Sequence, residues 1–207
     1  NREGLEIITE ALEIETRVLG PDHPDLADWL HQLGNANQAL GDQEAAEIHF
    51  QKSLELRRAA FGDRHPSTVR SLYSLATALS ERGSHQQARE FMLEVLAAQR
   101  QQFGPDHALI ANALHALGVI DSRLKRFEQG REWLEEALAM RLKLFGDDHM
   151  HVAHSYLALS RMALDQGRRE DCRTLLEKAE RIARNNVSSE HPIFESLTEL
   201  SALLNEA

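Results

Sequence analysis

Cysteine is almost missing from this sequence, since Cys172 is the only one among 207 residues. No intrachain disulfide can form, which fits a reducing compartment, and we therefore expect a cytoplasmic protein. Long apolar runs are missing too, because no stretch approaches the ~18 residues of a membrane span. The longest candidate, ALIANALHALGVI, is interrupted by Asn112 and His115 and indicates a core helix. A signal peptide and an initiator methionine are also lacking, so we expect a segment of a longer chain.

Basic residues are outnumbered. The chain has 23 Lys and Arg against 33 Asp and Glu, which leaves a formal net charge of −10. Such a chain repels phosphate backbones, and we expect neither nucleic acid nor an anionic membrane as a partner. The sequence also lacks a Gly-rich phosphate loop, a Gly-x-Ser-x-Gly motif and a His-Glu-x-x-His motif. We therefore expect a protein that is not an enzyme and has no cofactor.

A short motif with a histidine recurs at a fixed interval along the sequence. The stretch VLGPDHPDL returns as FGDRHP, FGPDHA, FGDDHM and VSSEHP, and its histidine recurs every 42 residues, at His23, His65, His107, His149 and His191. A fixed interval of this size indicates a repeat protein. We expect a single array over residues 1–207. It comprises a half repeat (1–18), four full repeats (19–60, 61–102, 103–144 and 145–186) and a C-terminal capping half repeat (187–207).

Each repeat has the pattern of two helices. In the first full repeat, Pro24 suits a helix start, Gly41 breaks the helix, and Gly62 suits the end of a second one. Over the whole array this predicts an all-α fold of about ten helices in antiparallel pairs. Two positions per repeat carry small side chains, as close helix packing requires. Cys172 falls at one of them, so we expect a buried, inert thiol.

The repeat resembles the tetratricopeptide repeat. The matching residues are Leu30-x-x-Leu33-Gly34, followed by Ala46-x-x-x-Phe50. The family's usual length is ~34 residues, and the 42-residue form with LGPDHP between copies is similar to the kinesin light chain subtype. The resemblance implies a right-handed solenoid that binds peptides or proteins in a concave groove. It further implies the regulatory or sensing part of a larger multidomain protein.

The five recurrent histidines do not suit a metal site. They occupy one loop position per repeat, so stacking places them at least roughly 8–10 Å apart, whereas zinc needs its ligands within ~2.3 Å of one point. We expect each of them to cap or pack the start of the next helix. His151 and His154 could share a helix face, but they lack a third ligand, and no metal is expected there either.

The resemblance places the groove on one face of the first helix of each repeat. Its candidate residues are Asp28, His31, Asn35, Arg70, Tyr73, Thr77, Asn112, His115, Arg123, His154 and Arg161. Three arginines on this wall offset three acids, Asp28, Glu81 and Asp165, so the wall is formally neutral. Its histidines could make it positive below neutral pH. An extended peptide with acidic residues would suit the arginines. In the alternative interpretation, Asp28, Glu81 or Asp165 already neutralises each arginine.

Two further expectations concern packing and assembly. Asn37 and Asp121 lie where the family often has Tyr, so they should be partly buried and need polar partners.

A self-association module is the alternative to a peptide-binding scaffold, because half repeats at both ends would leave stacking faces open and give a weak homo-oligomer.

Overall fold

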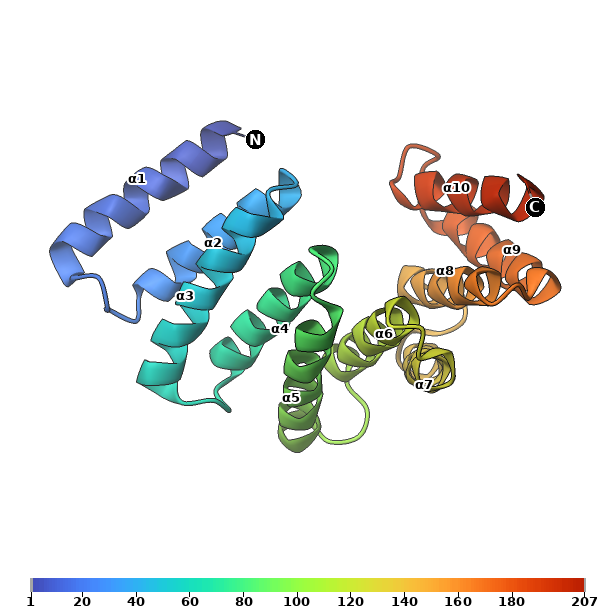
Figure 1. Ribbon diagram of the computed structural model, residues 1–207, viewed down its shortest axis with the longest axis horizontal. Helices are drawn as coiled ribbons and strands as arrows, with labels where there is room; N and C mark the ends of the chain where they lie inside the picture. Colours follow the sequence, from blue (N-terminus) through green and yellow to red (C-terminus); the bar gives the residue numbers. More distant parts are fainter. Residues whose placement is uncertain (1, 207) are drawn as a thin grey trace. The chain divides into compact units, whose positions relative to one another are not determined.

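The computed structural model describes the backbone of residues 2–206 and the side chains of residues 4–206, and the regular secondary structure of this part is all α-helix. The prediction of an all-α fold in sequential antiparallel pairs is confirmed (Figure 1). No helix in the described part is both long and apolar enough to cross a membrane. The ten helices are α1 (Arg2–Leu19), α2 (Leu26–Ala39), α3 (Gln43–Phe61), α4 (Pro66–Glu81), α5 (His85–Phe103), α6 (Ala108–Arg123), α7 (Phe127–Phe145), α8 (Met150–Asp165), α9 (Arg169–Asn186) and α10 (Ile193–Glu206).

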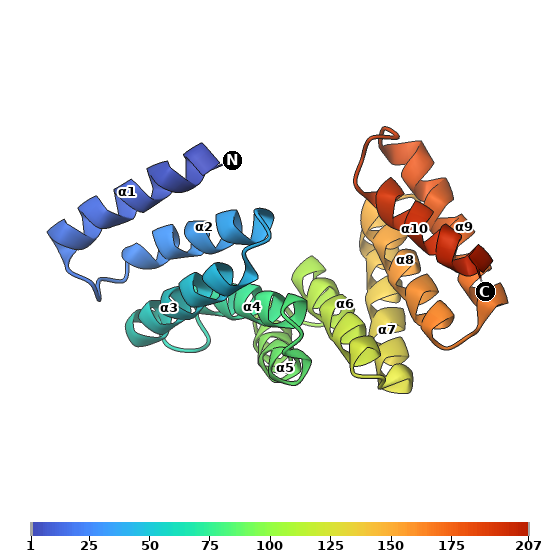
Figure 2. The same ribbon diagram turned by 45° about the horizontal axis from the view of Figure 1, so that its top comes forward.

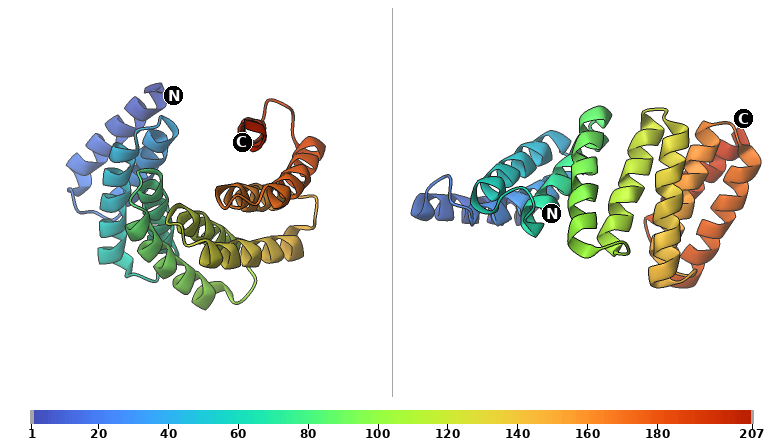
Figure 3. Two further views of the ribbon diagram at one scale, coloured as in Figure 1. Left: turned by 45° about the vertical axis from the view of Figure 1, so that its right-hand side comes forward. Right: turned by 90° about the horizontal axis from the view of Figure 1, so that it is seen from below.

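The chain forms two compact units. Unit 1 is Asn1–Gln102 and unit 2 is Phe103–Ala207. Within each unit, helices pack in chain order: α1 on α2, α2 on α3 and α3 on α4 in the first, and α6 through α10 in the second (Figures 2 and 3). The candidate groove residues are therefore described separately for each unit. That all 207 residues form one array of repeats stays a prediction.

Small side chains lie where two helices approach most closely. A Cβ on Gly34 would come within 2.4 Å of the Phe50 ring, so the backbone of α2 leaves the space that this aromatic side chain fills. The fourth repeat has Ser160 and Cys172 at the paired small positions, and the Ser160 hydroxyl donates to the Cys172 carbonyl at 2.9 Å. Cys172 is completely buried, as predicted.

The recurrent histidines cap helices. The Nδ1 atoms of His65, His107 and His149 accept the backbone N–H two residues ahead at 3.3, 3.2 and 3.1 Å. Each ring also stacks on the phenylalanine that ends the preceding helix, with centroids 4.1–4.7 Å apart. The predicted local capping role of these histidines is confirmed.

The two polar residues expected in the core have partners. Asn37 is 7% exposed, and its Nδ2 donates to the Leu33 carbonyl at 2.9 Å. Asp121 is fully buried and accepts a hydrogen bond from Trp133 Nε1 at 3.1 Å. Both contacts satisfy groups whose burial would otherwise be unfavourable.

Candidate functional site

The candidate wall of unit 1 lies on α2 and α4, the first helices of two consecutive repeats. Of its candidate residues, Asp28, Asn35 and Arg70 are exposed. Tyr73 and Thr77 are half-buried, and His31 is buried. Asp28 and Arg70 meet between the helices, with Arg70 Nη2 at 3.2 Å from Asp28 Oδ1. The Thr77 hydroxyl bonds back to the Tyr73 carbonyl at 3.0 Å and so stays within its own helix.

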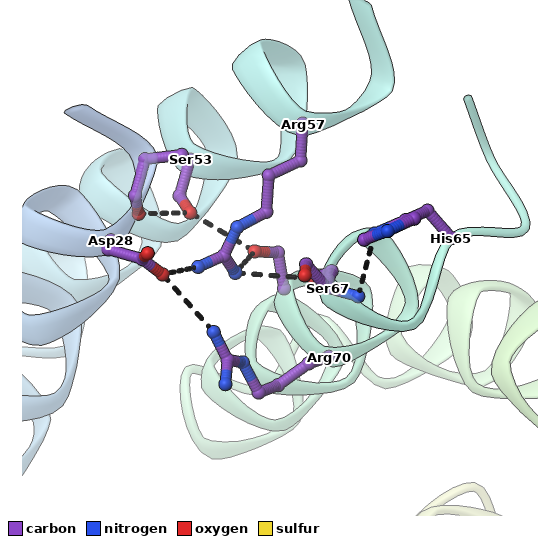
Figure 4. A network of polar contacts seen from close by, with 8 residues as sticks. Asp28, Ser53, Arg57, His65, Ser67 and Arg70 are labelled. Atoms are coloured by element: carbon purple, nitrogen blue, oxygen red, sulfur yellow. Dashed lines mark hydrogen bonds and ion pairs between the residues drawn. The ribbon is translucent and has the colours of Figure 1, made fainter. Parts of the chain in front are cut away.

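A buried arginine supports this wall from behind. Arg57 on α3 has 2% of its surface exposed, yet its guanidinium donates to Asp28, to the Ser71 hydroxyl and, at 3.2 Å, to the Ser67 carbonyl (Figure 4). Asp28 therefore lies between one buried and one exposed arginine. The buried cation is compensated in the way that charged groups in a protein interior require.

Unit 2 repeats this device 84 residues later. Arg141 on α7 is 4% exposed and donates to the Ser155 hydroxyl at 2.7 Å, the His151 carbonyl at 3.0 Å and Asn112 Oδ1 at 3.0 Å. The acceptors match those of Arg57, except that Asn112 stands where unit 1 has Asp28.

Neither arginine was expected from the sequence pattern, because both lie on second helices. The available signal was the shared 84-residue spacing of arginine, serine and histidine: Arg57 and Arg141, Ser71 and Ser155, His31 and His115.

The wall histidines are neutral near physiological pH. Burial, together with the charge of Arg57, lowers the pKa of His31 from 6.5 to about 4. Burial and Arg141 lower the pKa of His115 to about 3, and burial also lowers the pKa of His154. Making the wall positive through these side chains therefore needs a more acidic solution than an ordinary histidine would, because the low-dielectric surroundings and nearby cations disfavour the imidazolium form.

Unit 2 contains a cavity of about 560 Å³ on the predicted wall, between α6, α8 and α10. Four of the candidate residues line it: His115, Arg123, His154 and Arg161. Apolar side chains form part of its surface, among them Val119, Leu157, Ala158 and Leu200, and polar atoms form much of the rest. We call this cavity the unit 2 groove.

Opposite charges balance around the unit 2 groove. Arg161 Nη1 lies 3.3 Å from Glu199 on α10, and its Nε lies 3.7 Å from Asp165 on its own helix. Arg123 contributes the second positive charge of the lining. Arg70 pairs with Asp28 and Arg161 with Asp165, which are ion pairs of the kind that the alternative interpretation expects. Glu199 was not among the predicted partners.

The lining of the unit 2 groove mixes polar and apolar side chains. Among the described residues, no group of three or more His, Cys, Asp or Glu is placed to hold a metal ion. Helices paired in chain order define a helical-repeat protein.

The comparisons give the family. The tetratricopeptide repeat model matches residues 1–59, 46–101, 81–129 and 109–185, and the chain therefore belongs to the tetratricopeptide repeat family. Repeats of this family generally form protein-binding scaffolds and are typically non-catalytic. No curated protein matches the sequence.

Solved structures with similar folds include kinesin light chain-like proteins. The TPR-like repeats of a kinesin light chain-type protein from Podosopora anserina are 25% identical, with a TM-score of 0.73 over 90% of this chain and 89% of that one. BtubC (BKLC) from P. vanneervenii is 19% identical, with a TM-score of 0.75 over 98% and 83%. A Rap protein complexed with competence and sporulation factor is 14% identical, with a TM-score of 0.71 over 97% and 57%.

Proposed function

We propose that this chain is a protein-binding scaffold whose unit 2 groove receives an extended peptide or an exposed segment of a partner protein. The observation that carries the proposal is the 560 Å³ cavity on the wall where the repeat pattern predicts recognition. A concave site with an apolar surface and a few convergent polar groups is the usual form of a ligand site.

The chemistry of the groove suits a peptide. Burying a ligand side chain against Leu157 and Ala158 contributes about 25 cal/mol per Å² of apolar area. A ligand carboxylate that replaces the contacts of Arg161 with Glu199 and Asp165 would accept charge-assisted hydrogen bonds from this guanidinium, with Arg123 in the same lining, so we propose peptides with acidic residues as ligands. The Rap neighbour complexed with a peptide factor supports peptide binding by this fold.

The wall of unit 1 is proposed as a separate binding surface. Its exposed residues Asp28, Asn35 and Arg70, with Tyr73 beside them, offer donors, acceptors and an aromatic side chain to a partner. The Arg57 contacts hold Asp28 in place before any ligand arrives, which reduces the ordering that binding requires.

The test uses a random peptide library displayed on phage. Peptides should be enriched on the wild-type protein and lost with Ser196→Trp, because Ser196 is exposed on α10 and lines the groove, so a large ring there fills it. The matched control is Thr198→Trp, on the same helix but outside this lining. Equal enrichment on wild type and Ser196→Trp would exclude the unit 2 groove.

We further propose a wider role. The chain is a single array of repeats within a larger multidomain protein, serves as its regulatory or sensing part, and works in a reducing compartment that suits its lone cysteine. Co-purification of the natural full-length chain with a partner, lost in Ser196→Trp, is the supporting result.

Self-association is a second candidate, and the exposed face of α1 favours it. Ile7, Ile14 and Val18 lie on one face of this helix and are 63%, 52% and 76% exposed. Sedimentation velocity at several concentrations would detect a weak oligomer, and Ile14→Glu should abolish it. A monomer at all concentrations removes this candidate.

A further inference from the structure

Glu199 on α10 reaches into the unit 2 groove and binds its central arginine. Arg161 Nη1 is 3.3 Å from Glu199 Oε1, and Arg161, Glu199 and Asp165 all line the cavity. The guanidinium of Arg161, which a ligand carboxylate would approach, is thus already paired with a carboxylate. That carboxylate is the side chain of Glu199 on α10.

This contact is easily displaced, although the helix that presents it is firmly anchored. The side chains of Arg161 and Glu199 are 50% and 63% exposed, and exposed pairs of this kind are weak because water screens both charges. The backbone of α10 is held by the buried side chains of Leu197, Leu200 and Leu204. Glu199 can therefore leave Arg161 without α10 leaving its place.

The acidic side chain of Glu199 is specific to α10 and has no acidic counterpart in the earlier copies of the repeat. The last repeat has one residue fewer between its histidine and its first framework leucine, so Glu199 can be aligned with the earlier copies in two ways. One alignment gives His31, Tyr73, His115 and Leu157, and the other gives Gln32, Ser74, Ala116 and Ala158. Neither contains an acid, so the repeat pattern does not require one here.

We propose that Glu199 is an internal competitor for the unit 2 groove: it occupies Arg161 in the free protein, and a ligand carboxylate replaces it. This inference rests on the proposed function. Glu199 lowers the affinity for acidic ligands, because they must displace one carboxylate and approach another, Asp165. Ligands that bind without contacting Arg161 are unaffected. The residue therefore sets how strongly the groove selects for negative charge.

The experiment starts from peptides enriched on the wild-type protein from the phage library. Each is synthesised as found and with its acidic residues changed to the amides, and Kd is measured for wild type, Glu199→Gln and Glu195→Gln. Acidic peptides should bind Glu199→Gln about two- to five-fold more tightly than wild type, while the amide forms bind both alike. Arg161→Gln, introduced together with Glu199→Gln, should remove the gain.

Glu195→Gln is the matched control. Glu195 is exposed on the same helix, outside the groove lining, so this variant changes net charge equally without touching Arg161. Equal gains with both variants, or no gain with Glu199→Gln, overturn the competitor role, as does a library that yields no acidic peptides. Those results leave peptide binding intact, whereas enrichment that Ser196→Trp does not reduce overturns the proposed function and this inference together.

Discussion

Arg57 is a charged residue that is almost fully buried, and its setting explains why it is tolerated. Its donors are used by Asp28, the Ser71 hydroxyl and the Ser67 carbonyl. A lysine in its place is not equivalent, because the guanidinium is a planar fork and the ammonium is a compact point charge. The residue links the second helix of one repeat to the walls of two first helices.

We predict that Arg57→Lys lowers the free energy of unfolding by about 1–3 kcal/mol, because buried acceptors lose their donors. Urea denaturation monitored by circular dichroism measures the change. Arg58→Lys is the matched control, since Arg58 is half-buried and its pairs with Asp63 and Glu94 lie at the surface. A loss for Arg57→Lys no larger than that of the control would show that the fork geometry is unimportant.

We predict that His31 makes stability fall in acid. Its pKa is about 4 in the folded protein and 6.5 in the unfolded chain. Below pH 6.5 the unfolded state therefore binds the extra proton, and stability is lost progressively until pH falls through about 4. At pH 5 the loss from this residue is about 2 kcal/mol.

The measurement is urea denaturation of wild type and His31→Gln at pH 8.5, 7.5 and 5. Between pH 8.5 and 7.5 the two proteins should change in parallel, and from 7.5 to 5 the wild type should lose more. Parallel curves down to pH 5 would contradict a depressed pKa for His31.

The recurring element is a helix start that combines a cap with a ring stack. The His107 ring accepts the Leu109 N–H at 3.2 Å and stacks on Phe103 at 4.1 Å between centroids. The cap satisfies one of the free N–H groups at a helix start. The stack holds the His107 ring against Phe103 within unit 2.

We predict that His107→Ala destabilises the protein by about 0.5–2 kcal/mol through loss of the cap. His107→Asn should restore part of this, because asparagine can cap the helix but cannot stack on Phe103 in the same way. Thermal unfolding of the three proteins separates the two contributions. If Asn and Ala variants melt together, the stack and not the cap stabilises the turn.

At the scale of the whole molecule, packing within each unit joins mainly helices that are neighbours in the chain, with smaller contacts of α8 with α6 and α10. The stability of such repeat proteins is close to a sum of repeat and nearest-neighbour terms. Damage at one end should therefore stay local. Unit 1 and unit 2 each have their own set of internal contacts, which fits this expectation.

We predict that Leu197→Ala speeds amide exchange in α9 and α10 and leaves α2 and α3 unchanged, because Leu197 is 4% exposed within the C-terminal core. Phe50→Ala should do the reverse. Hydrogen–deuterium exchange with mass spectrometry reports both. A uniform rise along the chain in either variant would indicate one fully cooperative molecule instead.

The sequence by itself determined the class of fold and the positions of helix starts and turns. A 42-residue interval of histidine, glycine and small side chains leaves little freedom, because helix starts, turns and close contacts depend on local residue types. It likewise placed Cys172 in the core and His65, His107 and His149 at helix starts. It also assigned four of the residues that line the unit 2 groove.

Only the tertiary structure decided the charge state and polar contacts of the walls. Arg57 and Arg141 reach them from second helices, and Glu199 reaches Arg161 from α10, so the partners are 29 to 38 residues apart in the chain. The pKa values of His31 and His115 depend on burial and on those arginines. Periodicity predicts the helix face on which a side chain lies. Long-range packing determines its protonation state, its hydrogen-bond and ion-pair partners and its exposure to solvent.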